Sequence, residues 1–178
     1  MLSVGESFPE FNKLACVSRE AGKEFVNITS EEHKEAGKWM VMFWYPKDFT
    51  FVCPTEIAEF NNHFDEFEDS NSILYGASTD SEFVHLAWRN DHNDLKDLRF
   101  PLIADTSKSL SEELGILQQG EKVAYRATFI VDPEGIIQWI NINNDETGRN
   151  IDEVVRALRA TQSQEKTPCN WVPGEATL

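Results

Sequence analysis

The chain has 178 residues and a net charge of −15, because 31 acidic residues outnumber 16 basic ones. Such an acidic surface repels phosphate backbones and anionic lipids, so we expect no nucleic-acid or membrane role. The longest apolar run, residues 39–45, is far shorter than the roughly 20 residues of a membrane helix. The first residues lack a basic stretch followed by an apolar one, which favours a cytoplasmic protein without a secretory signal.

The first elements are predicted to be a strand pair, a short helix and a buried strand. Residues 11–17 and 25–28 are the two strands, separated by a turn. Thr29 and Glu32 have the spacing of a capping box, which predicts the start of the helix. The apolar run 39–45 is bounded by turn residues and fits a central strand buried on both faces.

The middle of the chain is predicted to alternate helices with strands. An amphipathic helix comes first, because four apolar residues form one stripe at helical spacing: Ile57, Phe60, Phe64 and Phe67. The elements predicted next are a strand, a helix, an extended segment and another helix, at residues 73–77, 81–90, 100–103 and 107–114.

A hairpin and a last helix complete the predicted domain, which spans residues 1–160. The hairpin strands are 127–131 and 136–140, and Asn150 caps the helix that follows. This alternation predicts an α/β protein with a mixed central sheet and helices on both faces. The final hairpin and helix resemble the second half of a thioredoxin-like fold. Apolar periodicity is lost after residue 160, so 161–178 is predicted to be a flexible C-terminal arm.

Cys53 lies where the buried strand has ended and the amphipathic helix is about to start. Pro54 suits the first helical turn, and Glu56 is in the capping-box position. Free backbone N–H groups and the helix dipole favour an anion at this point, and a thiolate is the nucleophilic form of cysteine. The alternative is that Cys53 is a small buried residue that closes the helix start.

The segment around Cys53 carries a more specific pattern. Pro46, Thr50 and Cys53 have the spacing P-x-x-x-T-x-x-C, which resembles the signature of the peroxiredoxins. Residues 48–56 are close to the form found in the typical two-cysteine branch. Other segments resemble the same branch, so that the match covers nearly the whole chain: 78–80, Trp88, 101–105, 126–135 and 174–178. The pattern is closest to that of bacterial alkyl hydroperoxide reductase subunits C.

The resemblance implies four roles at the site. Cys53 is the peroxidatic cysteine, Thr50 hydrogen-bonds the peroxide, and Pro46 limits solvent at the sulfur. Arg126 stabilises the thiolate and polarises the O–O bond. Each residue also has a simpler interpretation when it is taken alone. Thr50 could be an ordinary loop hydroxyl, Pro46 could simply end a strand, and Arg126 could be a charge at a strand edge. Their joint match to one constellation favours the catalytic roles.

Three further residues are assigned by the same resemblance. Glu56 orients Arg126, and Arg149 supports this network, although a solvated arginine before the last helix is an alternative for Arg149. Cys169 in the arm is the resolving cysteine, which attacks Cys53 of a partner subunit. Sequence distance by itself allows the disulfide within one chain or between two. Cys16 has no motif around it and is expected to be a structural thiol.

The expected function is thiol-dependent reduction of hydrogen peroxide and small organic hydroperoxides. Cys53 becomes a sulfenic acid, and Cys169 then forms a disulfide with it. The resemblance implies a flavoprotein disulfide reductase or thioredoxin as electron donor, and homodimers that form a decamer. No cofactor is expected, and the cysteines and histidines lack metal-binding spacing. A thioredoxin-type oxidoreductase is disfavoured because C-x-x-C is absent, and a chaperone-like holdase is a further alternative.

Two expectations concern oxidation. The first helical turn, residues 53–56, must unwind to let Cys53 reach Cys169. Residues 89–98 lack the glycine motif of the peroxiredoxins that overoxidise readily, and no helical extension follows residue 178. We therefore expect an enzyme that resists overoxidation.

Overall fold

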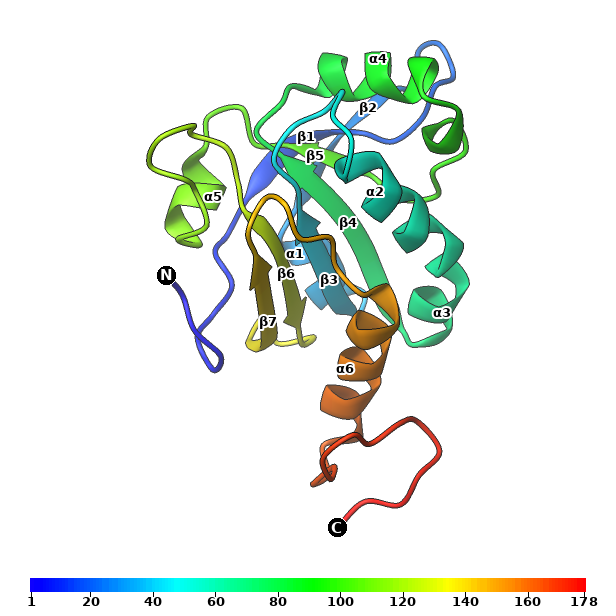
Figure 1. Ribbon diagram of the computed structural model, residues 1–178, viewed down its shortest axis with the longest axis vertical. Helices are drawn as coiled ribbons and strands as arrows, with labels where there is room; N and C mark the ends of the chain where they lie inside the picture. The colour runs from blue at the N-terminus through cyan, green and yellow to red at the C-terminus, as the bar shows by residue number, and fades with distance from the viewer.

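The computed structural model describes residues 1–178 and contains one mixed sheet of seven strands with helices on both faces (Figure 1). The strand order is β2-β1-β5-β4-β3-β6-β7. The strands are β1 Asn12–Cys16, β2 Phe25–Thr29, β3 Trp39–Trp44, β4 Ser72–Ser78, β5 Leu102–Ala104, β6 Arg126–Val131 and β7 Ile137–Asn143. β4 lies parallel to both β3 and β5, and the other neighbours pair antiparallel. The predicted α/β class with a mixed sheet is confirmed.

Helices cover the sheet on its two faces. They are α1 Glu31–Glu35, α2 Cys53–Asn62, α3 Phe64–Asp69, α4 Glu82–Asp91, α5 Ser109–Glu113 and α6 Ile151–Ser163, with a short 3-10 helix at Asn93–Leu95. α2, α3 and α6 contribute to one apolar cluster, and α5 contributes to the other. None of these helices has both the length and the apolar character that crossing a membrane requires.

β3 contributes residues to both apolar clusters, and the loop that carries the site residues follows it. Val41 and Phe43 face α2 and α6, whereas Met40, Met42 and Trp44 face the opposite cluster. This alternation confirms the prediction of a strand buried on both faces. β6 runs antiparallel to β3, so Arg126, the first residue of β6, lies near the C-terminal end of β3.

Two predicted elements differ from the structure. The predicted continuous helix through Phe67 is wrong, because the chain bends at His63 and forms α2 and α3 separately. The His63 ring bridges the Glu59 carbonyl at 2.9 Å and the Asp152 carboxylate of α6 at 3.0 Å. These contacts fix the junction against α6. At the other end of α6, the helix continues to Ser163, so the first three residues of the predicted arm are helical.

Helix capping was predicted correctly at α6 and only partly at α1. The Asn150 side chain accepts a hydrogen bond from the Glu153 amide at 3.1 Å, as expected of an N-cap. At α1 the Glu32 carboxylate accepts the Thr29 amide at 3.1 Å, as predicted, but the N-cap residue is Ser30, whose hydroxyl accepts the Phe11 amide instead of capping. Tertiary contact therefore takes the capping side chain away from the helix.

Candidate active site

Cys53 is the first residue of α2, and its side chain is only 1% exposed. Val52 is the N-cap residue, and its carbonyl accepts the Thr55 amide, the Glu56 amide and the Thr55 hydroxyl at 3.1, 3.3 and 2.6 Å. The predicted position of Cys53 beside the N-cap is confirmed. The positive end of the helix dipole therefore favours negative charge at this sulfur.

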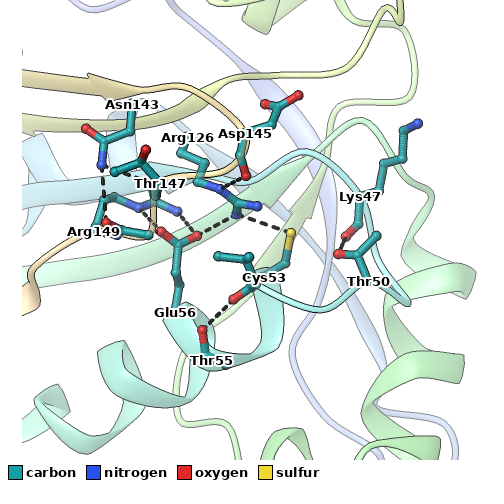
Figure 2. Close-up of polar contacts among 12 residues, drawn as sticks. Lys47, Thr50, Cys53, Thr55, Glu56, Arg126, Asn143, Asp145, Thr147 and Arg149 are labelled. Atoms are coloured by element: carbon teal, nitrogen blue, oxygen red, sulfur yellow. Dashed lines mark hydrogen bonds and ion pairs between the residues drawn. The ribbon is translucent and has the colours of Figure 1, made fainter.

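The Arg126 guanidinium lies directly against the Cys53 sulfur (Figure 2). Its Nη1 is 3.3 Å from Sγ and donates to the Glu56 carboxylate at 2.8 Å, while its Nε donates to the Asp145 carbonyl at 2.8 Å. Burial lowers the pKa of Arg126, but the interactions with Cys53 and Glu56 outweigh burial and raise it. The arginine therefore stays charged and offers a fixed positive group to a thiolate.

Glu56 is buried between two arginines and does not act as a capping residue. Its carboxylate accepts hydrogen bonds from Arg149 Nε at 2.9 Å and Nη2 at 2.7 Å, in addition to the bond from Arg126. Burial raises the pKa of Glu56, but the two arginines outweigh burial and hold it below its ordinary value. The capping-box interpretation is thus wrong, and the expected contact of Glu56 with Arg126 is present.

Arg149 connects this network to the sheet and to the core. Its Nη1 donates to the Ala127 carbonyl at 2.9 Å and lies 3.2 Å from the Thr128 hydroxyl. The guanidinium also lies over the Phe43 and Phe60 rings, at 5.3 and 5.7 Å from their centroids. These two rings stack at 3.8 Å with an interplanar angle of 8°. Arg149 is therefore not the solvated arginine of the alternative interpretation.

The loop between β3 and α2 carries Pro46 and Thr50. Pro46 is buried two residues after the end of β3. Thr50 is half-buried on the loop that leads into Cys53 (Figure 2). The Thr50 hydroxyl donates to the Lys47 carbonyl at 2.8 Å. Because its proton is used in this bond, the hydroxyl oxygen is left to accept a hydrogen bond. Thr50 can thus receive the O–H of a peroxide.

A buried acid and histidine anchor this loop, and sequence reasoning missed them. The Asp48 amide donates to the Asp80 carboxylate at 2.8 Å, and Asp48 Oδ2 lies 2.7 Å from His85 Nδ1. His85 Nε2 lies 3.1 Å from the Ile103 carbonyl in β5. Burial raises the pKa of Asp48, although His85 acts in the opposite direction. Asp48 stands inside the quoted motif, but nothing in the sequence pairs it with His85.

The other two cysteines lie apart from Cys53, and all three are free. Cys16 is buried in β1, 3.8 Å from Arg89 Nη1, and burial raises its pKa, so that it stays a thiol. Cys169 is exposed on the segment that follows α6. In Figure 1 this segment forms the lower end of the molecule, whereas the start of α2 lies in the upper half. No group of three or more histidine, cysteine or acidic side chains is arranged to hold a metal ion.

Comparison with known proteins agrees with this geometry. The chain is 47% identical over 186 residues to alkyl hydroperoxide reductase C of Mycobacterium tuberculosis, covering 100% of this chain and 94% of that one. It is 44% identical over 178 residues to the putative peroxiredoxin YkuU of Bacillus subtilis, covering 98% and 97%.

Solved structures show the same similarity. Mycobacterium bovis AhpC superposes with a TM-score of 0.87 at 46% identity, covering 96% of this chain and 98% of that one. A reduced 2-Cys peroxiredoxin of Plasmodium vivax gives a TM-score of 0.90 at 31% identity, covering 98% and 91%. These neighbours confirm the thioredoxin-like fold. The model of the AhpC/TSA family matches residues 4–140, and the chain therefore belongs to this family of peroxiredoxins.

Proposed function

We propose that Cys53 is the nucleophile with which this peroxiredoxin reduces hydrogen peroxide and small organic hydroperoxides. The observation that carries the proposal is the buried Cys53 sulfur at the start of α2, 3.3 Å from the Arg126 guanidinium. The thiolate bonds to one peroxide oxygen and the O–O bond breaks. The other oxygen takes a proton from water and leaves as water or an alcohol, and Cys53 becomes a sulfenic acid.

The neighbouring residues favour the transition state of this step. Negative charge develops on the leaving oxygen, and the buried Arg126 guanidinium is a fixed donor for it. The Thr50 oxygen accepts the peroxide O–H and thereby orients the O–O bond along the line of attack. Pro46 is buried beside this loop and helps to exclude solvent. Glu56 and Arg149 hold Arg126 in place through buried hydrogen bonds.

We further propose that Cys169 resolves the sulfenic acid on a partner subunit. The Cys169 thiol condenses with the sulfenic acid, an S–S bond forms and one water leaves. The separation of α2 from the C-terminal end along the long axis in Figure 1 supports a disulfide between chains. Because Cys53 is buried, the first turn of α2 must unwind during this step.

Exposed aromatic side chains support the proposed homodimer and decamer. Phe83 and Phe49 are 65% and 52% exposed and pack beside Phe25 and Trp88, and Phe51 is 92% exposed. Large exposed apolar groups in one region favour contact with another protein surface.

The proposed electron donor is a flavoprotein disulfide reductase or thioredoxin, and the proposed location is the cytoplasm, a reducing compartment.

Two cysteine variants test the proposal. Cys53→Ser is expected to abolish peroxide consumption with either NADH and the flavoprotein or NADPH, thioredoxin reductase and thioredoxin. Cys169→Ser is expected to abolish turnover with these donors but to leave one equivalent of peroxide consumed per subunit. Cys16→Ser is the matched control and should retain turnover. Full activity of Cys53→Ser would refute the proposal.

A further inference from the structure

The segment after α6 is a closed loop, in contrast to the flexible arm expected from the sequence. Residues 164–178 are called the C-terminal loop below. The Leu178 amide donates to the Lys166 carbonyl at 2.9 Å, and the Thr177 hydroxyl bonds the Glu165 carboxylate. These two contacts join the ends of the loop. The loop is therefore a preformed unit that can move as a whole.

Trp171 docks this loop on the rest of the protein. Its side chain is 6% exposed, and its indole N–H donates within the loop to the Glu175 carbonyl at 3.0 Å. Its carbonyl accepts Arg156 Nη1 of α6 at 3.2 Å. This is the only hydrogen bond between residues 166–178 and residues 1–163, and no ion pair joins them. One arginine thus provides the polar tie of the loop.

Two hollows that open to solvent flank Arg156. A hollow of about 540 Å³ lies between Arg156, Glu153 and Cys169. A second hollow, of about 320 Å³, lies between α3, α6 and residues 172–173. The buried Trp171 side chain supplies the apolar part of the docking. The arginine–carbonyl bond is its polar part and the only one with a fixed direction.

Arg156 is itself oriented and charged for this contact. Its Nε and Nη2 donate to the Glu153 carboxylate at 2.5 and 2.8 Å, which leaves Nη1 for the Trp171 carbonyl. The hydrogen bond to Glu153 raises the pKa of Arg156. Arg156 and Cys169 line the same hollow, so the guanidinium lies on the side of the loop that carries this cysteine.

We propose that Arg156 is a positioning residue for the resolving step, because its bond to the Trp171 carbonyl latches the C-terminal loop and withholds Cys169 until the loop is released. This inference rests on the proposed function, in which Cys169 travels to Cys53 of the partner subunit. The strength of the latch then sets how fast the disulfide forms relative to a second oxidation of Cys53 by peroxide. A weaker latch gives faster resolution and less sulfinic acid.

The variant Arg156→Gln tests the latch, with Arg159→Gln as the matched control. Arg159 lies on the same helix and contacts Ser70 and Glu66, but it makes no hydrogen bond to the loop. Losing one partly exposed, charge-assisted bond should increase amide hydrogen exchange in residues 165–178 by about fivefold. Rapid-quench gels after one equivalent of peroxide should show disulfide formation accelerated by about the same factor. Mass spectrometry should show less Cys53 sulfinic acid at higher peroxide.

Conservative rescue separates a latch from a general structural role. Arg156→Lys keeps a charged donor and should restore most of the slow exchange and slow disulfide formation, whereas Arg159→Gln should match the wild type. Unchanged exchange in Arg156→Gln, or faster exchange with unchanged or slower disulfide formation, would overturn the latch. The first oxidation of Cys53 is measured in the same samples. If it fails in the wild type, the proposed function itself is wrong, and the latch result is read separately from the exchange data.

Discussion

The surroundings of Cys53 and of Cys169 are built in opposite ways. Cys53 is buried at a helix start, and the arginine on its sulfur belongs to a buried network of Glu56, Arg126 and Arg149. Cys169 is exposed on the C-terminal loop, and a single hydrogen bond joins residues 166–178 to residues 1–163. In the proposed mechanism, attack on peroxide by Cys53 needs fixed charges, whereas resolution by Cys169 needs a segment that leaves readily. The chain thus holds one of these cysteines rigidly and the other loosely.

The largest expected effect is on the free energy of unfolding, when Glu56→Gln removes the carboxylate of the buried network around Cys53. Both arginines lose a buried counter-charge, and removing one partner of a buried ion pair costs about 3–5 kcal/mol. Urea unfolding measures this loss of stability. Glu153→Gln is the control, because it breaks a partly exposed pair and should cost less than about 1 kcal/mol. Equal losses in the two variants would contradict the distinction between the two regions.

The pH dependence of unfolding checks the same residue. The pKa of Glu56 is lowered in the folded protein from an ordinary value of 4.5. Its stabilisation is therefore fully present above pH 4.5 and is lost as pH falls through the lower folded value. Glu56→Gln should lack this part of the acid destabilisation. An acid-unfolding curve with the same slope as the wild type would contradict the ion-pair assignment.

Arg126→Lys is expected to have the next largest effect, on rate more than on stability. A lysine keeps one charge but cannot bond Cys53, Glu56 and the Asp145 carbonyl at once. The rate of Cys53 oxidation should fall by about 100-fold, as for loss of a preorganised donor. Competition kinetics with a reference peroxidase measure the rate. Arg99→Lys, at an exposed pair, should leave it unchanged.

Trp171→Ala tests the loosely held region. Although the side chain is 6% exposed, the loop can leave α6 without unfolding the sheet. The free energy of global unfolding should therefore change by less than about 1 kcal/mol, instead of the 3–5 kcal/mol of a core tryptophan. Urea unfolding together with amide exchange of the C-terminal loop measures both quantities. A loss typical of a core residue would show that the loop belongs to the cooperative core.

The smallest effect is expected from His63→Gln at the junction of α2 and α3. Burial lowers the pKa of His63, but the Glu59 carbonyl and the Asp152 carboxylate outweigh it and raise the value above 6.5. The stabilisation is thus present below pH 6.5 and is lost as pH rises through the folded value. It should be less than about 0.5 kcal/mol, because solvent screens the contact. Thermal unfolding at pH 5.5 and 8.5 compares the variant with the wild type.

Local patterns were sufficient to predict most of the sheet, and they pointed to residues that the structure brings together around Cys53. The apolar run at β3 predicts a strand buried on both faces because its residues point alternately to two sides. The motif around Cys53 and its resemblance to a family bring in Arg126 and Arg149, which the structure places around Glu56. The strand could be predicted because its signal lies within one short segment, and the proximity of the two arginines to Glu56 could be expected only through the family resemblance.

Contacts between distant segments explain what the sequence did not show. Asp48 and His85 are 37 residues apart, and only the fold brings them to 2.7 Å. The bend at His63 depends on Asp152 in α6. The C-terminal loop was predicted to be flexible because its polar composition lacks periodicity, whereas Trp171 and the contact between its ends give it structure. The members of these pairs are too far apart in the sequence for helical or strand periodicity to reveal them.

The stacked rings of Phe43 and Phe60 beneath Arg149 make the interior of the protein part of its chemistry. A change in the volume of either ring shifts the guanidinium that holds Glu56, and through Glu56 the arginine on the sulfur. Under the proposed mechanism, engineers who repack this interior for thermal tolerance should therefore also alter the speed of peroxide removal. The two properties have to be selected together in any library that covers these positions.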